Sequence, residues 1–415
     1  MNFYLILIFV IYILIAAFNY WLDHLNISNL KKHGADVPPE FEGQIDESLL
    51  GKIRDYTIEN TRFGVVSSMI NNIILLVFIF GGILDIYNSW ASSLDLSFIL
   101  AGLVFFLLLV YAETVISIPF SLYRTFKIEK KYDFNTMTPK LWIMDQIKSL
   151  IITTIMLSLM IAGGLWILLK SPDLWWFWVW CFFFTFSIFI MYISPYVLEP
   201  LFNKFVPIDD EELEGDINSV MTRVGIKVSR VFKMDASKRS THTNAYFSGI
   251  GKVKRIVLFD TLLKQLSKSE ILSVLAHEAG HWKKKHILKF IIVTEIIALI
   301  AFYISYHLVG SDVLIELFNV KDSTVFAKLI LLGFLGSMVM FPFTPLIHYL
   351  SRRHEREADD YSCTITGDAG SMITSLVKLS KDNLSNLHPH PLYASFHYSH
   401  PPVLQRIRRL KDNKK

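Results

Sequence analysis

The 415-residue sequence has little charge and almost no cysteine. Only 19% of its residues are Asp, Glu, Lys or Arg, while 52% are hydrophobic and the mean hydropathy is +0.41. A soluble globular domain has about 25% charged residues and a smaller apolar share. The composition excludes an ordinary soluble protein and indicates that much of the chain lies in a membrane.

Two further absences narrow the class of protein. The two cysteines, Cys181 and Cys363, belong to no metal-binding motif, and Cys181 falls in an apolar run, so we expect no structural disulfide. The apolar N-terminal stretch has no basic segment before it and no small-residue cleavage site after it. We therefore expect it to be a retained membrane span and not a signal peptide.

Long apolar runs are abundant. A membrane-spanning helix needs about 20 mostly apolar residues, and seven runs of roughly this length have few charges. The sequence therefore predicts an all-α membrane protein with seven spans. These lie near residues 2–22, 63–86, 97–121, 147–169, 174–198, 287–309 and 325–347.

Lys and Arg are concentrated in alternate connections. The segments after the first, third and fifth spans are basic, whereas those near 87–96 and 170–173 are almost free of Lys and Arg, and that near 310–324 has only Lys321. The positive-inside rule then puts the N-terminus outside and the C-terminus in the cytoplasm. The net charge of +4 fits loops that face anionic lipid, and no nucleic-acid partner is expected.

Four regions follow from this pattern. Residues 1–198 are a five-span region with basic inside loops, and 199–286 are an inside segment with both helix and strand patterns. Residues 287–347 are a two-span helical hairpin, and 348–415 are an inside C-terminal segment.

The second region predicts a small α+β insertion. VSRVFKMD, TNAYFSG and KRIVLFD read as short strands, the last two as a hairpin through Gly249 to Lys252. Ser267 and Glu270 then form a capping box, after which apolar residues recur at helical spacing.

That helix carries the sequence HEAGH. His277 and His281 are four residues apart, so both imidazoles project from one helical face and can bind one metal ion. Glu278 lies between them, where its carboxylate can reach a metal-bound water, which is the pattern of the zinc metallopeptidase motif H-E-x-x-H. His286 falls off this face and is expected to be structural. A chance match is the alternative, so a third ligand is needed.

The segment HYLSRRHEREADDYS supplies candidates for that ligand. If the last two spans form a helical hairpin, this segment returns to the face that carries the motif. We predict Glu355 as the third ligand and Asp359, four residues later, as a carboxylate that fixes a ligand imidazole. Glu357 and Asp360 are rivals on other faces, and their alternative role is a solvated acidic surface beside arginines.

Two other zinc-protease patterns do not fit. A metzincin would need Gly at 284 and His at 287, where this chain has Lys284 and Ile287. An intramembrane protease would bury the zinc helix within a span, but Lys283, Lys284 and Lys285 interrupt it and place the metal at the inside surface. We therefore expect a gluzincin-type site, with H-E-x-x-H and a downstream Glu ligand, at the inside membrane face.

Three stretches together resemble the type I CAAX prenyl proteases, a family of integral-membrane zinc metalloproteases. They are residues 237–286, SRRHEREAD at 351–359 and HYSHPP at 397–402, and the resemblance extends over essentially the whole chain. One departure is His348, which stands where the family tends to have Asn. That departure concerns a supporting contact and no ligand.

The resemblance implies seven helices around a large chamber, with one Zn²⁺ per chain facing its interior. It implies cleavage of a prenylated CAAX protein or peptide after the prenylated Cys, with release of the last three residues. Glu278 would take the proton of the attacking water. Membrane lipids are the other expected partners, and we expect a functional monomer in the inner membrane of a prokaryote or the endoplasmic reticulum membrane of a eukaryote.

Five further residues complete the predicted site. As an edge strand beside the zinc helix, TNAYFSG would bind substrate as an added strand through Asn244, Ala245 and Tyr246; alternatively it pairs only within its own sheet. By the resemblance, His400 would donate a hydrogen bond to the oxyanion, with Arg406 nearby as a substrate contact. The alternative role of His400 is structural.

Other functions share parts of this pattern. A broad-specificity quality-control protease of the membrane would use the same zinc site and differ only in substrate. A transporter with a structural zinc would tolerate loss of Glu278 and would have charged residues in its spans, for which Glu113 and Asp145 are candidates. A di-iron oxygenase would need several histidine boxes, which the sequence lacks.

Overall fold

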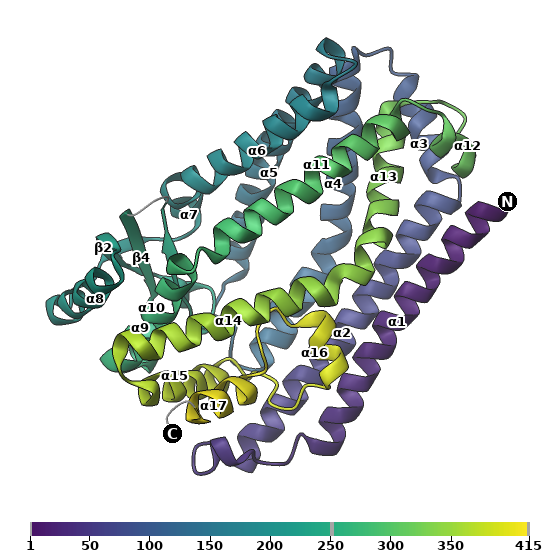
Figure 1. Ribbon diagram of the computed structural model, residues 1–415. Helices are drawn as coiled ribbons and strands as arrows, with labels where there is room; N and C mark the ends of the chain where they lie inside the picture. Colours follow the sequence, from purple (N-terminus) through teal and green to yellow (C-terminus); the bar gives the residue numbers. More distant parts are fainter. Residues whose placement is uncertain (1, 250–252, 413–415) are drawn as a thin grey trace.

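The computed structural model describes residues 2–249 and 253–412, and most of them are helical (Figure 1). Within this part of the chain, seven helical segments are long and apolar enough to cross a membrane, as the sequence predicts. They are α1 (Phe3–His33), α2 (Glu47–Phe80), α4 (Phe98–Tyr123) with η2 (Arg124–Glu129), α5 (Pro139–Lys170), α6 (Trp175–Ile193) with η3 (Ser194–Leu198) and α7 (Glu199–Phe202), α11 (His286–Val309), and α13 (Val325–Met340) with η5 (Phe341–Phe343) and α14 (Thr344–Thr366).

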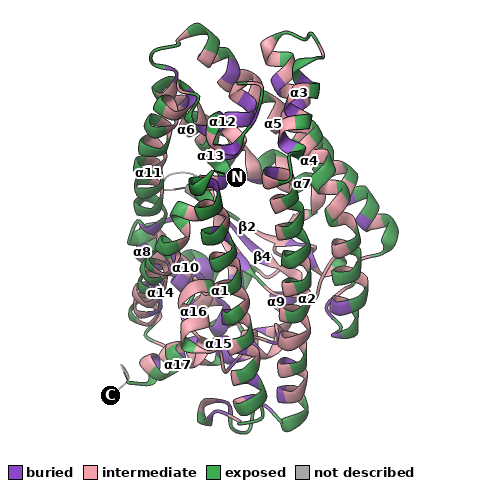
Figure 2. Cartoon of the chain, turned by 90° about the vertical axis from the view of Figure 1, so that its right-hand side faces the viewer, coloured by how far each residue is buried: buried purple, intermediate pink, exposed green. Residues whose placement is uncertain are grey.

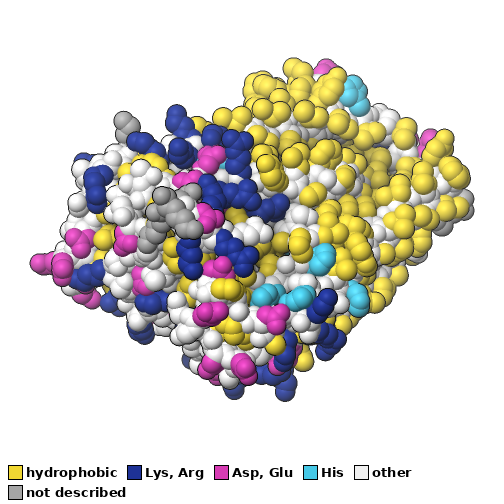
Figure 3. All heavy atoms as spheres, turned by 60° about the horizontal axis from the view of Figure 1, so that its bottom comes forward, with side chains coloured by type: hydrophobic (Ala, Val, Ile, Leu, Met, Phe, Trp, Pro, Cys, Tyr) yellow, Lys and Arg dark blue, Asp and Glu magenta, His cyan; other side chains and the backbone are white. Residues whose placement is uncertain are grey.

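Several of these helices are longer than a bilayer is thick. Helices α1, α2 and α5 have 31, 34 and 32 residues. At 1.5 Å per residue they extend about 45–50 Å, whereas the hydrocarbon core is about 30 Å thick. The ends with the predicted inside connections carry the extra polar turns. Figure 3 shows the result, with hydrophobic side chains gathered over one part of the surface and charged side chains over the other.

The spans leave an open interior. In the most apolar 18-residue window of each span, between 0% and 17% of the residues are buried, and exposed positions run along α1 and α11 in Figure 2. Helices of a solid bundle would each bury one continuous face. The spans bury too few residues for a solidly packed bundle, which agrees with the predicted chamber.

The helices end at other residues than the predicted apolar runs in several places, and two of these differences affect the architecture. The second span was expected near 63–86, but α2 ends at Phe80 because Gly82 takes a left-handed conformation (φ 82°), and α3 (Ile83–Ser92) starts a new helix. The last span was expected to end at residue 347, which lies inside α14. The helix that follows α13 therefore extends without a break from the membrane region to the predicted ligand Glu355.

A four-stranded sheet confirms the predicted α+β insertion. Strands β1 (Phe205–Pro207), β2 (Lys227–Met234), β4 (Val253–Phe259) and β3 (Ala245–Ser248) lie side by side in that order. β2 and β4 are parallel, while β3 and β4 form the predicted antiparallel pair, with Ala245 opposite Leu258. The predicted turn, Gly249 to Lys252, falls largely outside the described residues. β1 was not predicted, because three residues show no alternation.

Three helices pack on this sheet and form with it the hydrophobic core of the insertion. They are α8 (Glu211–Val224), α9 (Asp260–Gln265) and α10 (Lys268–Lys283). Ile217, Ile256, Leu258 and Leu275 are fully buried between them. The other described elements are η1 (Pro39–Phe41), η4 (Ala236–Lys238), α12 (Val313–Phe318), α15 (Ala369–Asp382), α16 (Pro391–His397) and α17 (Val403–Asp412).

The start of α10 is fixed in two ways. The predicted capping box is present, with the Glu270 carboxylate accepting a hydrogen bond from the Ser267 N–H (2.7 Å). The same carboxylate oxygen accepts from Lys378 Nζ on α15 (2.7 Å), and Glu270 is only 4% exposed. The helix that carries the HEAGH motif is thus anchored to the C-terminal segment.

Glu270→Gln should lower stability at neutral pH but not in acid. Burial by itself raises the pKa of Glu270, but the Lys378 hydrogen bond and the Ser267 N–H outweigh burial and lower it. A lowered folded pKa stabilises the protein above the unfolded pKa of about 4.3, and this contribution is lost as the pH falls through the folded value. Gln keeps the cap, so the thermal midpoints of variant and wild type should differ at pH 7 and converge as the pH falls through the lowered folded pKa of Glu270.

The exposed carboxylate Glu212, which pairs with Lys268, provides the matched control. Glu212→Gln should change the midpoint little at either pH, because exposed ion pairs contribute about 0–1 kcal/mol. A Glu270→Gln difference that did not depend on pH would contradict the role assigned to the carboxylate charge.

Candidate metal centre

Helices α10 and α14 lie in unusually close contact. A Cβ atom added to Gly280 would lie 3.1 Å from Ala358 Cα and 3.2 Å from Ala358 O, so any side chain there would push the two helices apart. Small residues at such a crossing let two helix backbones approach. The glycine of HEAGH therefore brings the motif up against the segment that holds Glu355.

Three contacts at helical spacing follow this crossing. Ser362 Oγ donates to the Ser273 carbonyl (2.6 Å), His277 Nδ1 lies 2.8 Å from Asp359 Oδ1, and His281 Nε2 lies 3.3 Å from Glu355 Oε1. Residue numbers rise along α10 as they fall along α14, so the helices are antiparallel. Each step of one turn along α10 therefore brings a residue opposite a partner about one turn earlier in α14.

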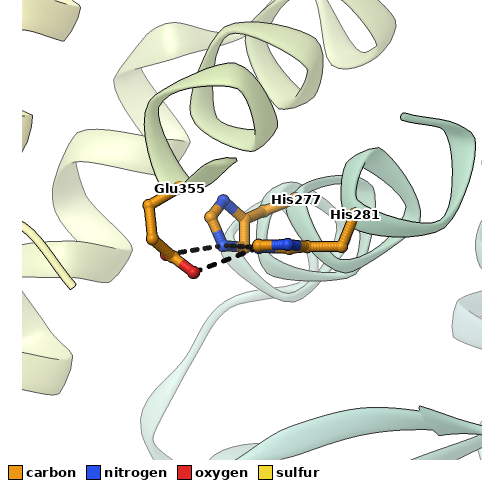
Figure 4. A group of neighbouring side chains, drawn as sticks. All are labelled: His277, His281 and Glu355. Atoms are coloured by element: carbon orange, nitrogen blue, oxygen red, sulfur yellow. Dashed lines mark hydrogen bonds and ion pairs between the residues drawn. The ribbon is translucent and has the colours of Figure 1, made fainter. Parts of the chain in front are cut away.

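His277, His281 and Glu355 point toward one another and form a triangle of donor atoms (Figure 4). The two Nε2 atoms are 3.3 Å apart, and they lie 3.4 Å and 3.3 Å from the oxygens of Glu355. Zinc–ligand bonds of about 2.0–2.1 Å put tetrahedral ligand atoms about 3.3–3.4 Å apart. Glu355 Oε2 is buried and has no hydrogen-bond partner within the described chain. The donor set fits a zinc ion.

The charges around the triangle also favour a cation. Burial by itself lowers the pKa of His277, but the carboxylates of Asp359 and Glu355 outweigh burial and raise it to about 9. Without a metal the imidazole therefore holds a proton between the two carboxylates. A divalent metal would replace this proton.

Glu278 lies beside the triangle and takes no part in it. No hydrogen bond or ion pair to its carboxylate is found among the described residues, and burial raises the pKa of Glu278 despite the two neighbouring imidazoles. A carboxylate with a raised pKa is a stronger base than a solvated one. It is the free carboxylate of the motif.

The C-terminal tail is held against the same site. Arg352 on α14 donates to the Tyr398 carbonyl (2.7 Å), and His400 Nε2 lies 3.3 Å from Glu355 Oε1. Arg406 on α17 donates to both oxygens of Asp359 (2.6 and 2.9 Å), and its side chain is 12% exposed. Its guanidinium is largely used by Asp359, so the predicted substrate contact of Arg406 stays a prediction.

The predicted substrate strand lies at the edge of the sheet. β3 pairs with β4 on one side, and no strand of the described chain pairs with its other side. Ala245 and Tyr246 are in β3, whereas Asn244 precedes it and accepts the Ala245 N–H with its side chain (2.8 Å). Tyr246 OH donates to Glu199 (2.7 Å). Helix α10 packs beside this strand.

Sequence reasoning missed one set of contacts. His286 Nδ1 lies 3.2 Å from His281 Nδ1, and His286 Nε2 lies 3.2 Å from Glu357 Oε2. Glu357 was expected only as a rival ligand or part of a solvated surface. The short segment between the motif and the next span, HWKKKH, was the available signal, but spacing alone does not show that it turns back on the motif.

The comparisons with known proteins identify the family of the chain. Residues 26–204 match the model of the CAAX prenyl protease N-terminal domain with five membrane helices, and residues 207–414 match the model of peptidase family M48. The chain belongs to the CAAX prenyl protease branch of peptidase family M48. The predicted family is therefore confirmed, and the protein is a multi-pass membrane metallopeptidase.

Relatives of this family match over most of their length. CAAX prenyl protease 1 of Saccharomyces cerevisiae is 34% identical, with 90% of this chain and 88% of the relative covered. The CAAX prenyl protease 1 homolog of Arabidopsis thaliana is 32% identical, with 96% and 95% covered. The crystal structure of S. mikatae Ste24p covers 99% of both chains at a TM-score of 0.89 and 32% identity. This solved structure therefore shares the fold of the chain over nearly its whole length.

Asp359→Asn should weaken zinc binding. The variant removes the charge that fixes His277 from its outer nitrogen, and such partners of a ligand contribute about 10–100-fold to metal affinity. Competition with a chelator measures the zinc dissociation constant. Asp360→Asn is the matched control, because Asp360 is the next residue of α14 and pairs with Arg409, away from the triangle. Equal losses in both variants would contradict the role of Asp359.

Proposed function

We propose that this chain is a zinc endopeptidase that removes the last three residues from prenylated proteins or peptides with a C-terminal CAAX motif. The observation that carries the proposal is the triangle of His277, His281 and Glu355 beside the unpaired carboxylate of Glu278. The names of the relatives, CAAX prenyl protease 1, support the substrate class. One Zn²⁺ per chain accounts for the described donor set.

Proton transfer is the task of Glu278. When bound, zinc supplies Lewis acidity, which polarises the scissile carbonyl and acidifies the attacking water. Glu278 takes a proton from that water as its oxygen attacks the carbonyl carbon. The carboxyl then gives the proton to the leaving amine as the C–N bond breaks. Its raised pKa supports both roles, since the group must first accept and then release a proton near neutral pH.

His400, Asp359 and Arg406 surround this reaction. The 3.3 Å contact of His400 with Glu355 supports its role as a donor to the oxyanion. Arg406 and Asp359 support His277 from behind, which favours a positioning role for Arg406 through Asp359. The guanidinium of Arg406 balances the carboxylate of Asp359, so this buried ion pair carries no net charge.

The free edge of β3 supports binding of the substrate as an added strand. An extended peptide would gain main-chain hydrogen bonds there, which are independent of its sequence. Asn244, Ala245 and Tyr246 are the proposed contacts. The hydrogen bond from Tyr246 to Glu199 fixes the strand to α7, at the end of the fifth span.

The same geometry supports a cytoplasmic site next to the membrane. Lys283, Lys284 and Lys285 join α10 to the span α11 and suit the face with anionic lipid. We therefore propose that the N-terminus lies outside and the C-terminus in the cytoplasm, and that the chain acts as a monomer in the inner membrane or the endoplasmic reticulum membrane. Asp145, a candidate transport residue, is paired with Arg239 (2.8 Å), which weakens the transporter alternative.

Glu278→Gln should abolish cleavage and keep the metal. With purified protein and a farnesylated CAAX peptide, we expect turnover to fall at least about 100-fold, the lower end for loss of a general base. Zinc content should remain at the wild-type level, because Glu278 is not a ligand. Mass spectrometry of the products identifies the bond that is cut.

Other outcomes separate the alternatives. Cleavage of unprenylated membrane polypeptides, without preference for the farnesylated peptide, would favour the quality-control protease. Wild-type protein that holds zinc and cuts no peptide, with Glu278→Gln indistinguishable from it, would overturn the protease proposal.

A further inference from the structure

The second histidine of the motif is supported differently from the first. His277 meets a carboxylate at its outer nitrogen, whereas His281 Nδ1 meets another imidazole, that of His286, at 3.2 Å. His286 is 3% exposed and belongs to α11, not to the motif helix. His286 is not one of the three predicted metal ligands, so its burial beside His281 needs another explanation.

The turn between α10 and α11 produces this contact. Lys285 alone separates Lys284, which caps α10, from His286, the first residue of α11, and it takes a left-handed conformation (φ 56°). A non-glycine residue in this region is uncommon and persists only where the surrounding structure holds it there. The conformation folds the chain back, so that His286 lies under His281.

Ligation fixes the direction of every proton in this chain of contacts. If His281 binds zinc through Nε2, its Nδ1 must carry the hydrogen and act as donor. His286 Nδ1 is then the acceptor, which leaves the hydrogen of the neutral His286 ring on Nε2. That atom lies 3.2 Å from Glu357 Oε2 and donates to it. Donors and acceptors therefore alternate without conflict from the metal to the carboxylate.

Two more side chains hold the far end in place. Arg353 Nε donates to Glu357 Oε1 (3.1 Å), and the ring of His354 stacks on that of His286 with centroids 4.1 Å apart and planes 8° apart. The plane of His286 and the position of Glu357 are thus both defined. α14 supplies all three residues, Arg353, His354 and Glu357, from the turn that also holds Glu355.

We propose that His286 is a positioning residue for the zinc ligand His281: it accepts the Nδ1–H of the ligand and passes the hydrogen bond on to Glu357. The inference rests on the proposed zinc site. It gives the second imidazole an outer support that matches the one Asp359 and Arg406 give to the first. Outer partners of this kind orient the ligand ring and contribute about 10–100-fold to metal affinity.

Two substitutions of similar polarity separate positioning from packing. His286→Asn keeps an acceptor oxygen at the place of Nδ1, which faces His281, whereas His286→Gln moves its amide to the place of Nε2. Gln is nearer to His in size. A packing role therefore predicts that Gln is the better replacement, and the positioning role predicts Asn.

The zinc dissociation constant of the full-length protein, measured by competition with a chelator, decides between them. We expect His286→Gln and His286→Ala to bind zinc about 10–100-fold more weakly than wild type and His286→Asn to stay close to wild type. The thermal midpoint of the zinc-free variants reports packing separately. Gln equal to or better than Asn, or Ala equal to wild type, would overturn the proposal.

Glu357 gives a second test at a more exposed position. Glu357→Gln keeps an acceptor for His286 and should leave zinc affinity close to wild type, while Glu357→Leu should weaken it. Equal affinities for Gln and Leu would count against the chain of hydrogen bonds. Wild-type protein that binds no zinc would overturn the zinc site itself, whereas zinc binding without peptide cleavage would overturn only the proposed function.

Discussion

The structure depends on the close crossing of α10 and α14. One helix comes from the α+β insertion and the other continues from the last membrane span, and they meet where Gly280 leaves no room for a side chain against Ala358. Because this contact brings the backbones together, short side chains reach across it: Ser273 to Ser362, His277 to Asp359 and His281 to Glu355. This single helix crossing brings together all three predicted metal ligands, two from α10 and one from α14.

Buried charge around this crossing is balanced locally. Asp359 would be costly alone inside the protein, but Arg406 faces both of its oxygens, and the imidazole of His277 lies on its other side. Without a metal the proton on His277 offsets the charge of Glu355, and a divalent cation would replace that proton. The tail, the last span and the motif helix are thus fixed to one another by the electrostatics of a single site.

The long membrane helices and the small sheet contribute differently to the structure. The apolar parts of the spans bury few residues and surround an open interior, and it is α14, the continuation of the last span, that reaches the site. The compact core under β2 and β4 holds α10 instead, with Leu275 and Ile271 on its buried face and Glu270 fixed by Lys378. A rigid site is therefore attached to an open membrane scaffold, and the edge strand β3 packs beside α10 and bonds to Glu199 at the end of the fifth span.

Local patterns in the sequence determined the spans, the capping box at Ser267, the hairpin of β3 and β4 and the motif at 277–281, since each depends on neighbouring residues and on the period of a helix or strand. The choice of Glu355 among nearby acids also followed, because the helical hairpin and a four-residue spacing restrict the face. Tertiary structure decided the rest. The contact of His286 with His281, the use of Arg406 by Asp359 and the continuity of α14 past residue 347 depend on how separate helices cross and on one left-handed residue, Lys285, and no local period encodes these.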